Sequence, residues 1–473
     1  MTFNSLAFAL FFAVVFGGVC VLRRRLVPRN VWLLLASWLF YGLFGWKWLL
    51  LLLGTQVFDY TMARLIDRLP PGDVRRKLCV AGSCTANLAV LGFFKYGNFL
   101  LDNYAWLGTH IGFNAARPML EIVQPAGISF YTFQSMSYVI DVYRGRLKAE
   151  AHPLHYSLFV SFFPQLVAGP IERATHLLPQ VKRPTEIAWS NIASGFWLIS
   201  AGLFKKVVLA DNVATVARAV FDAQTVPRGW ETVLAVYAFA IQIYCDFSGY
   251  SDIARGCARM MGFDLMRNFD LPYFATNPSD FWRRWHISLS TWLRDYLYIP
   301  LGGNRRGRVR TYVNLMLTML LGGLWHGASW MFVWWGAYHG LLLCGHRVIS
   351  GDRAKPQAGW RKWISIVLFF QLTCFGWLLF RSISVANFWR MLQPLYDRSA
   401  EHPVVLLTPN LLLTLAAVAI VLAGAQLVKY LADDHDVIFR IPWPVRAVIY
   451  AAMFLGLIVF GDFGGGQFIY FQF

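Results

Sequence analysis

The stretch from Thr311 to His346 reads TYVNLMLTMLLGGLWHGASWMFVWWGAYHGLLLCGH and contains no Lys, Arg, Asp or Glu. Basic residues flank it on both sides, in Arg305–Arg310 before it and at Arg347 after it. Two full crossings of a bilayer need about 40 residues, and this stretch is slightly shorter. Its length and flanking charges therefore predict a broken or re-entrant pair of helices, opened around Gly322-Gly323 and Gly327.

The composition of the whole chain predicts the same apolar environment. Of 473 residues, 57% are hydrophobic and 14% are charged, with a mean hydropathy of +0.47. Soluble domains carry about 25% charged residues, so this chain cannot cover itself with a water-facing surface. We predict an all-α, polytopic integral membrane protein, with one domain over residues 1–473 and no separate soluble domain. Further runs long enough to cross a bilayer are Leu6–Leu22, Trp363–Phe380, Leu411–Val428 and Val445–Val459.

The basic residues are concentrated in short loops. The net charge is +18, and clusters such as Arg23–Arg25 and Arg75–Lys77 are typical of the cytoplasmic side of a membrane protein. We expect no nucleic-acid partner, because no module of interleaved basic and aromatic residues lies outside the apolar runs. The first run has no preceding Lys or Arg and no A-x-A site, so we expect a retained helix rather than a cleaved signal. Val31–Phe58, interrupted by Gly42 and Gly45, is either one long tilted helix or two helices in a hairpin.

His326 is an ionisable residue inside the uncharged segment Leu321–Trp330. If a helix begins near Thr311, His326 lies about 20 Å along it, near the middle of the membrane. Ionisable groups at that depth are costly and are often functional. One interpretation is a neutral imidazole that accepts a proton from an attacking hydroxyl. The other is a histidine hydrogen-bonded between helices, with the glycines serving close packing.

The segment Ser279–Pro300 has the spacing of one apolar helical face, with several Trp residues and a basic remainder. We expect a single amphipathic helix at the membrane interface. His286 on it either binds donor or substrate or is an ordinary interfacial side chain. Arg283 and Arg284 either receive donor phosphates or lie against anionic lipid.

Asp246 and Asp252 place two carboxylates at the end of an apolar run. Too few ligands are adjacent for a metal site, and we predict none. Pairing with Arg255 or Arg259 is the favoured interpretation, because buried charges need partners. The sequence has no G-x-S-x-G, H-E-x-x-H, Walker A or G-x-G-x-x-G motif, which leaves serine-hydrolase, zincin and nucleotide-hydrolysis chemistry without support.

Two motifs carry a family resemblance. NPSDFWRRWHISLSTW at residues 277–292, followed by LWHG at residues 324–327, resembles the paired signature of the membrane-bound O-acyltransferase superfamily. The bacterial branch that includes the alginate O-acetylation membrane protein is the closer match, and its relatives serve cellulose and peptidoglycan acetylation and teichoic-acid D-alanylation. Further similar stretches are Phe94–Tyr96, Pro125–Gln134, Asp141–Gly145, Phe163–Glu172, Asp246–Asp252 and the C-terminal Phe468–Phe473.

The resemblance implies a fold and a set of site residues. It implies a helical funnel around a central tunnel, with about 11–13 membrane segments that include re-entrant and interfacial helices, and a core motif region of about residues 90–346. His326 matches the active-site histidine of the family, and His286 matches its second histidine. Candidate substrate- and donor-binding residues within the motifs are Trp282, Arg283, Arg284, Trp285, Trp325, Asp246 and Ser248.

The resulting prediction is a multi-pass enzyme of the cell inner membrane. It transfers acetyl from a cytoplasmic thioester, expected to be acetyl-CoA, for O-acetylation of an exported polysaccharide, alginate-like or another cell-surface glycan. An extracytoplasmic acetyltransferase is the expected partner protein, and no bound cofactor is expected. D-alanyl or other acyl transfer from a carrier protein to a cell-wall polymer is the alternative within the superfamily. A transporter with a proton-relay histidine and a structural scaffold are the alternatives of other classes.

Overall fold

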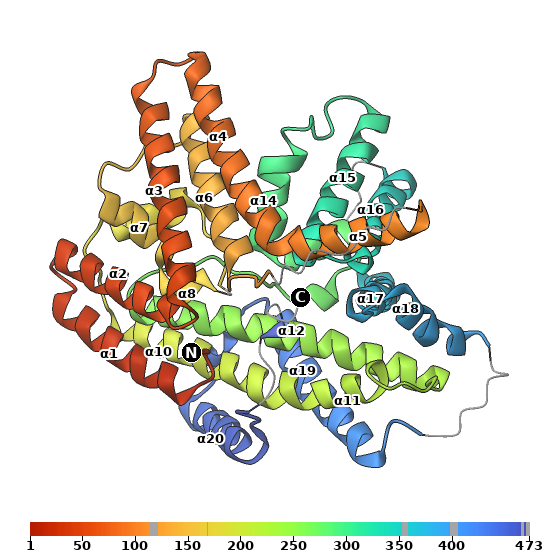
Figure 1. Cartoon of the computed structure of the whole chain (residues 1–473). Helices are drawn as coiled ribbons and strands as arrows, with labels where there is room; N and C mark the ends of the chain where they lie inside the picture. Colours follow the sequence, from red (N-terminus) through yellow and green to blue (C-terminus); the bar gives the residue numbers. More distant parts are fainter. Residues whose placement is uncertain (113–121, 168, 352–357, 398–404, 465–467, 470–473) are drawn as a thin grey trace. The chain divides into compact units, whose positions relative to one another are not determined.

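The computed structural model describes residues 1–112, 122–167, 169–351, 358–397, 405–464 and 468–469, and these residues form helices and connecting segments without a β-strand (Figure 1). Most of the C-terminal motif Phe468–Phe473 lies outside them. The chain divides into two compact units, unit 1 with residues 1–199, 254–266 and 327–329, and unit 2 with residues 200–253, 267–326 and 330–473. Each unit draws on several separate segments, and the prediction of one integral-membrane domain stays a prediction.

The helices that begin in unit 1 are α1 (Leu6–Leu22), α2 (Leu26–Gly42), α3 (Trp46–Arg68), α4 (Val74–Leu91), the π-helical η1 (Gly92–Tyr96), α5 (Gly97–His110), α6 (Ile128–Tyr143), α7 (Pro153–Ser161), α8 (Phe163–Leu166), α9 (Ala174–Val181) and α10 (Trp189–Leu203). Those that begin in unit 2 are the π-helical η2 (Phe204–Ala210), α11 (Asp211–Phe221), α12 (Gly229–Met260), η3 (Pro272–Phe274), α13 (Pro278–Arg284), α14 (Ile287–Leu293), the π-helical η4 (Arg294–Tyr298), α15 (Arg308–His326), α16 (Trp330–Ser350), α17 (Gly359–Arg381), α18 (Val385–Leu392), η5 (Gln393–Leu395), α19 (Pro409–Ala432), η6 (Val437–Arg440) and α20 (Trp443–Phe460).

Several helical runs have the length and composition of membrane spans. Among the described residues, seven helical runs are long and apolar enough to cross a membrane, and α1 is a shorter apolar helix. No side chain of α20 is buried, as expected for a helix whose apolar surface faces lipid. The all-α, polytopic prediction is therefore confirmed. The funnel, the tunnel and the count of 11–13 segments stay predictions. The seven runs are Trp46–Arg68, Val74–His110, Trp189–Phe221, Gly229–Met260, Gly359–Arg381, Pro409–Ala432 and Trp443–Phe460.

The run Val31–Phe58 contains two helices, which decides between the two predicted arrangements. Helix α2 ends at Gly42 and α3 begins at Trp46. Gly45 between them has φ +150°, a backbone conformation that side chains with a Cβ rarely adopt. The glycine thus permits the sharp change of direction, and α2 packs against α3.

Helices α15 and α16 form a closely packed hairpin in unit 2 (Figure 1). A Cβ on Gly323 would collide with the carbonyl oxygen of Phe332, and one on Gly336 would collide with that of Met319. These glycines let the two helix backbones approach each other. The predicted helix pair is present, but its predicted opening at Gly322-Gly323 is wrong, because both glycines are helical and the chain turns only at 327–329. The membrane depth of the hairpin stays a prediction.

The predicted continuous helix over Ser279–Pro300 is also wrong. The chain forms α13, breaks at Trp285-His286, and resumes as α14 and η4. Five residues of the predicted apolar face, Phe281, Trp285, Leu289, Trp292 and Leu293, are buried, whereas Trp282 and Tyr296 are partly exposed. Contacts within unit 2 override the helical continuity that the spacing indicates.

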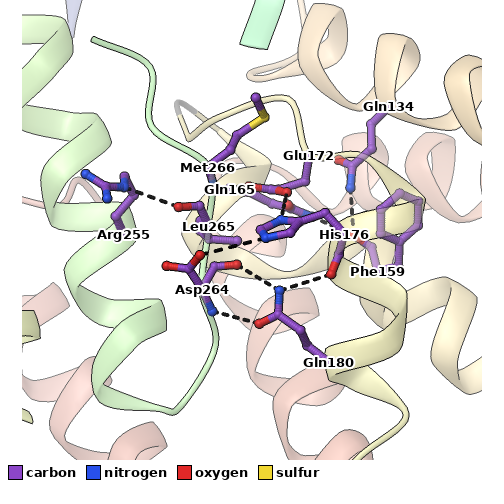
Figure 2. Close-up of polar contacts among 10 residues, drawn as sticks. All are labelled: Gln134, Phe159, Gln165, Glu172, His176, Gln180, Arg255, Asp264, Leu265 and Met266. Atoms are coloured by element: carbon purple, nitrogen blue, oxygen red, sulfur yellow. Dashed lines mark hydrogen bonds and ion pairs between the residues drawn. The ribbon is translucent and has the colours of Figure 1, made fainter. Parts of the chain in front are cut away.

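A cluster of polar contacts in unit 1, the α9 clasp, fastens the segment Met261–Met266 to helix α9 (Figure 2). The fully buried carboxylate of Glu172 accepts hydrogen bonds from the Met266 amide at 2.5 Å and from His176 Nδ1 at 2.8 Å. His176 Nε2 faces a carboxylate oxygen of Asp264 at 3.7 Å. The Gln180 side chain accepts from the Asp264 amide and donates to the Asp264 carbonyl. Glu172 before α9 and Gln180 on α9 thus satisfy backbone groups of the segment that follows α12.

The clasp gives a pH-dependence that can be measured. The hydrogen bond to Glu172 raises the pKa of His176, so the protonated ring stabilises the clasp fully below the ordinary histidine pKa of about 6.5. That stabilisation is lost as pH rises through the raised pKa. Because 42% of the His176 side chain is exposed, we expect a change of at most about 1 kcal/mol. After correction for intrinsic exchange, hydrogen-exchange protection of the Met266 amide should fall between about pH 6 and pH 8.

The matched control is His176→Gln, which keeps a hydrogen-bonding side chain but cannot titrate in this range. Its Met266 protection should not change with pH over the same interval. An equal pH response in both proteins would contradict the assignment to His176.

Candidate functional site

His286 occupies a strained position between α13 and α14. Its φ of 43° and ψ of 55° lie in the left-handed region, where non-glycine residues cost about 1 kcal/mol or more. Asn268 holds this break from one side, because its carbonyl accepts from the Ile287 amide at 2.9 Å and its side chain accepts from the Ser288 amide at 3.2 Å. Asn268 in turn donates to Ser251 Oγ at 3.2 Å. Strain maintained by neighbouring hydrogen bonds is characteristic of functional positions.

The strained backbone places the His286 imidazole beside His326. Both side chains are buried, and their ring centroids are 6.4 Å apart. His286 contacts Phe247 at 4.7 Å and Trp325 at 5.6 Å between centroids. Two histidines separated by forty positions in sequence thus come together inside unit 2.

His326 is the last residue of α15 and lies among aromatic rings. Trp335 contacts it at 5.0 Å, Trp325 at 5.2 Å and Phe380 at 5.4 Å between centroids. We call the two histidines with Phe247, Trp325, Trp335 and Phe380 the aromatic cage. Its members come from α12, α15, α16, α17 and the α13–α14 break. Walls of this kind exclude water, and a neutral imidazole in such surroundings can accept a proton from a reacting hydroxyl.

The tryptophans and arginines of the predicted site occupy different places. Trp325 belongs to the aromatic cage. Trp282 contacts Trp335 at 5.7 Å, next to the cage. Trp285 is buried against Phe281 and Trp377, which gives it a packing role.

Arg283 and Arg284 lie outside the aromatic cage and pair with acids. Arg283 is mostly exposed and lies 3.8 Å from Asp280, and Arg284 lies 3.0 Å from the same carboxylate. Arg284 also donates to the Asp270 carbonyl at 3.2 Å. The structure therefore does not bring these two predicted donor-binding residues to the histidines.

Asp246 belongs to a buried ion network. Its carboxylate lies 2.7 Å from Lys206 Nζ, and the same ammonium lies 2.8 Å from Asp211. Asp246 also accepts from the Ile469 amide at 2.7 Å, which ties the C-terminal segment to α12. Asp246 directly precedes the cage residue Phe247, so the network fixes one wall of the cage.

The predicted partner of Asp246 needs correction. Asp246 is paired with Lys206 and not with Arg255 or Arg259, and Asp252 lies 2.5 Å from Lys205. Lys205 also donates to Ser248 at 3.0 Å, so Ser248 serves this ion pair. The lysines precede α11, and this proximity between distant segments is a tertiary feature. Within the described part of the chain, no group of three His, Cys, Asp or Glu residues could hold a metal ion.

Sequence reasoning missed Lys206, Phe247, Trp335, Phe380 and Asn268. Lys206 carried a usable signal, because it is an ionisable residue within an apolar run. Trp335 follows His326 in the same uncharged stretch, but nothing separates it from other helix-packing aromatics. Phe380 and Asn268 carry no local signal, since their roles arise only from contacts between distant segments.

Comparisons with known proteins agree with this geometry. The profile of the membrane-bound O-acyltransferase family matches residues 146–388, which include both histidines. The chain is 41% identical to the probable alginate O-acetylase AlgI of Pseudomonas aeruginosa, over 84% of this chain and 75% of that protein. It is 38% identical to the peptidoglycan O-acetyltransferase of Helicobacter pylori, over 83% and 79%. It is 28% identical to the teichoic acid D-alanyltransferase of Bacillus subtilis, over 56% and 70%.

The buried ion network predicts a large effect of Lys206→Met on stability. Methionine is similar in volume but leaves Asp211 and Asp246 buried without their cation, which costs about 3–5 kcal/mol. The thermal unfolding temperature of the purified protein should fall by many degrees. Lys205→Met is the matched control, because its pair with Asp252 is partly exposed, and its effect should be much smaller. Equal shifts for the two variants would contradict the importance of the network.

Proposed function

The chain belongs to the membrane-bound O-acyltransferase family, and from this premise we propose that it is the membrane component that O-acetylates an exported polysaccharide. The proposal is supported by the relatives of about 40% identity, whose names specify O-acetylation of alginate or of peptidoglycan. Relatives that transfer D-alanine to teichoic acid are less similar, at 28% identity. O-acetyl transfer is therefore favoured over D-alanyl transfer, and family membership disfavours a transporter or a scaffold.

The observation that carries the proposal is the pairing of His286 and His326 inside the aromatic cage, at 6.4 Å between ring centroids. A single buried histidine has many packing explanations. Two histidines from separate segments, one of them on a strained backbone, are harder to explain by packing alone. Acyl transfer from a thioester to a hydroxyl needs a proton acceptor in a site that excludes water, because water would hydrolyse the donor.

The proposed reaction assigns the proton to His326. The imidazole removes the proton from the acceptor hydroxyl as its oxygen attacks the acetyl carbonyl. A carbon–oxygen bond forms, the carbon–sulfur bond breaks, and the departing thiolate takes the proton from the imidazolium. His286 positions the donor or acceptor beside His326. The aromatic cage keeps water from the carbonyl, and the left-handed turn fixes His286 before substrate arrives.

The donor, the partner and the location complete the proposal. Acetyl-CoA is the proposed donor, made on the cytoplasmic side of the inner membrane, while the glycan lies outside. A polytopic enzyme can connect the two compartments and hand acetyl to an extracytoplasmic acetyltransferase. The conversion of a cytoplasmic thioester into an extracytoplasmic ester is thus the task that the membrane fold would serve.

The test replaces His326 by alanine in cells that make the polysaccharide. We expect acetyl content of the exported polysaccharide to fall at least a hundredfold, because general-base catalysis contributes about 10²–10⁴ in rate. Membrane levels of the protein must match wild type. His346→Ala is the control, since His346 lies on α16 outside the cage, and it should leave acetylation unchanged. Normal acetylation in the His326→Ala strain would refute the role assigned to His326.

A further inference from the structure

Three aromatic side chains next to the aromatic cage contact one another pairwise in unit 2. The ring centroids of Trp335 and His339 are 4.7 Å apart, those of Trp282 and His339 are 5.2 Å apart, and those of Trp282 and Trp335 are 5.7 Å apart. We call these three residues the indole–imidazole triad. Trp335 also belongs to the cage and lies 5.0 Å from His326. The triad therefore contacts His326, the proposed proton acceptor, through Trp335.

Each member of the triad carries a buried ring nitrogen without a hydrogen-bond partner among the described residues. The atoms are Nε1 of Trp282, Nε1 of Trp335 and Nδ1 of His339. The side chains of Trp335 and His339 are almost completely buried, at 1% exposure each. A buried polar group without a partner costs about 1–3 kcal/mol, so native proteins rarely gather three in one place. These three nitrogens are therefore available to bind a polar ligand.

The surroundings hold the triad rings in place and carry no charge. Phe281 stacks on the His339 ring with an interplanar angle of 8°. Gly376 of α17 lies against His339, since a Cβ at that position would come within 2.8 Å of Nε2. The ring contacts of the triad are with uncharged aromatic residues or with histidine. A hydrocarbon chain at this place would leave all three nitrogens unsatisfied.

The triad offers two N–H donors and one imidazole nitrogen. A neutral amide matches this set, because its carbonyl accepts from an indole and its N–H can donate to an imidazole. Thioester donors built on pantetheine carry an amide two methylene groups away from the sulfur. If the thioester carbonyl lies at His326, the amide lies two methylene groups beyond the sulfur. It would then be close to Trp335, whose ring centroid is 5.0 Å from that of His326.

We propose that Trp282, Trp335 and His339 form a subsite that binds the first amide of the pantetheine arm of the thioester donor. The subsite rests on the proposed acetyl transfer and adds donor recognition to it. It also assigns a task to His339, which the family motifs leave without one. Coenzyme A and a carrier protein both present this arm, so the triad recognises their shared chemistry.

The experiment compares two small neutral donors on the purified full-length protein. S-acetyl-N-acetylcysteamine contains the thioester and the amide, and ethyl thioacetate contains the thioester alone. Release of free thiol, measured with the polysaccharide present as acetyl acceptor, gives kcat/KM for each donor. Wild type should prefer the amide-bearing donor, and His339→Leu should reduce that preference roughly tenfold, mainly through KM. His339→Asn, which retains a hydrogen-bonding group near the position of Nδ1, should keep most of the preference.

Two further variants sharpen the comparison. Trp335→Phe removes an indole N–H and should also reduce the preference for the amide. His346→Leu changes a histidine on the same helix outside the triad and should leave the preference unchanged. The subsite would be overturned if His339→Leu and Trp335→Phe lowered kcat/KM equally for both donors. That result would show that the triad only supports packing or holds a buried water.

The outcomes separate this subsite from the proposed function. If wild-type protein releases no thiol from either small donor or from acetyl-CoA, the proposed donor class fails and the subsite fails with it. If wild type is active but the variants keep its preference, only the subsite fails. Wild-type rates with acetyl-CoA and with an acetylated carrier protein then identify which source supplies the arm.

Discussion

The buried ion network around Lys206 is the interaction on which the site geometry depends. One ammonium bridges Asp211 and Asp246, at 2.8 and 2.7 Å, in an environment where an unpaired charge would be prohibitively costly. Asp246 also holds the Ile469 amide, and its neighbour Phe247 contacts both His286 and Phe468. The network therefore joins η2, α11, α12 and the C-terminal segment. The network therefore supports the wall of the cage beside His286, together with the packing of Phe247 on Phe269 and Phe468.

The second constraint is the left-handed backbone at His286. A continuous helix from α13 to α14 would relieve this strain. It would also place the imidazole at a different position, on the surface of that helix. The hydrogen bonds from Ile287 and Ser288 to Asn268 hold the break against that tendency. The fold thus stores a small amount of strain to present one side chain to His326, which is the arrangement that pre-organisation requires.

Several buried polar groups of unit 1 are hydrogen-bonded to other groups of the chain. In unit 1, Arg29 donates to the carbonyls of Val181 and Arg183, and the carboxylate of Asp59 accepts from Ser83 and Asn87. Fully satisfied groups of this kind stabilise and specify the packing of helices. The indole–imidazole triad differs from them, since its nitrogens have no such partners.

The sequence by itself determined the membrane environment, the all-helical class and the identity of the two histidines. Hydrophobic length and flanking charge are local properties, and the motifs around His286 and His326 are continuous in the chain. Tertiary structure alone decided that Asp246 pairs with Lys206 rather than with a nearby arginine, that the helix breaks at His286, and that Phe380 lies against His326. These features depend on contacts between segments far apart in sequence, where packing and charge pairing outweigh local periodicity, so no spacing rule could have placed them.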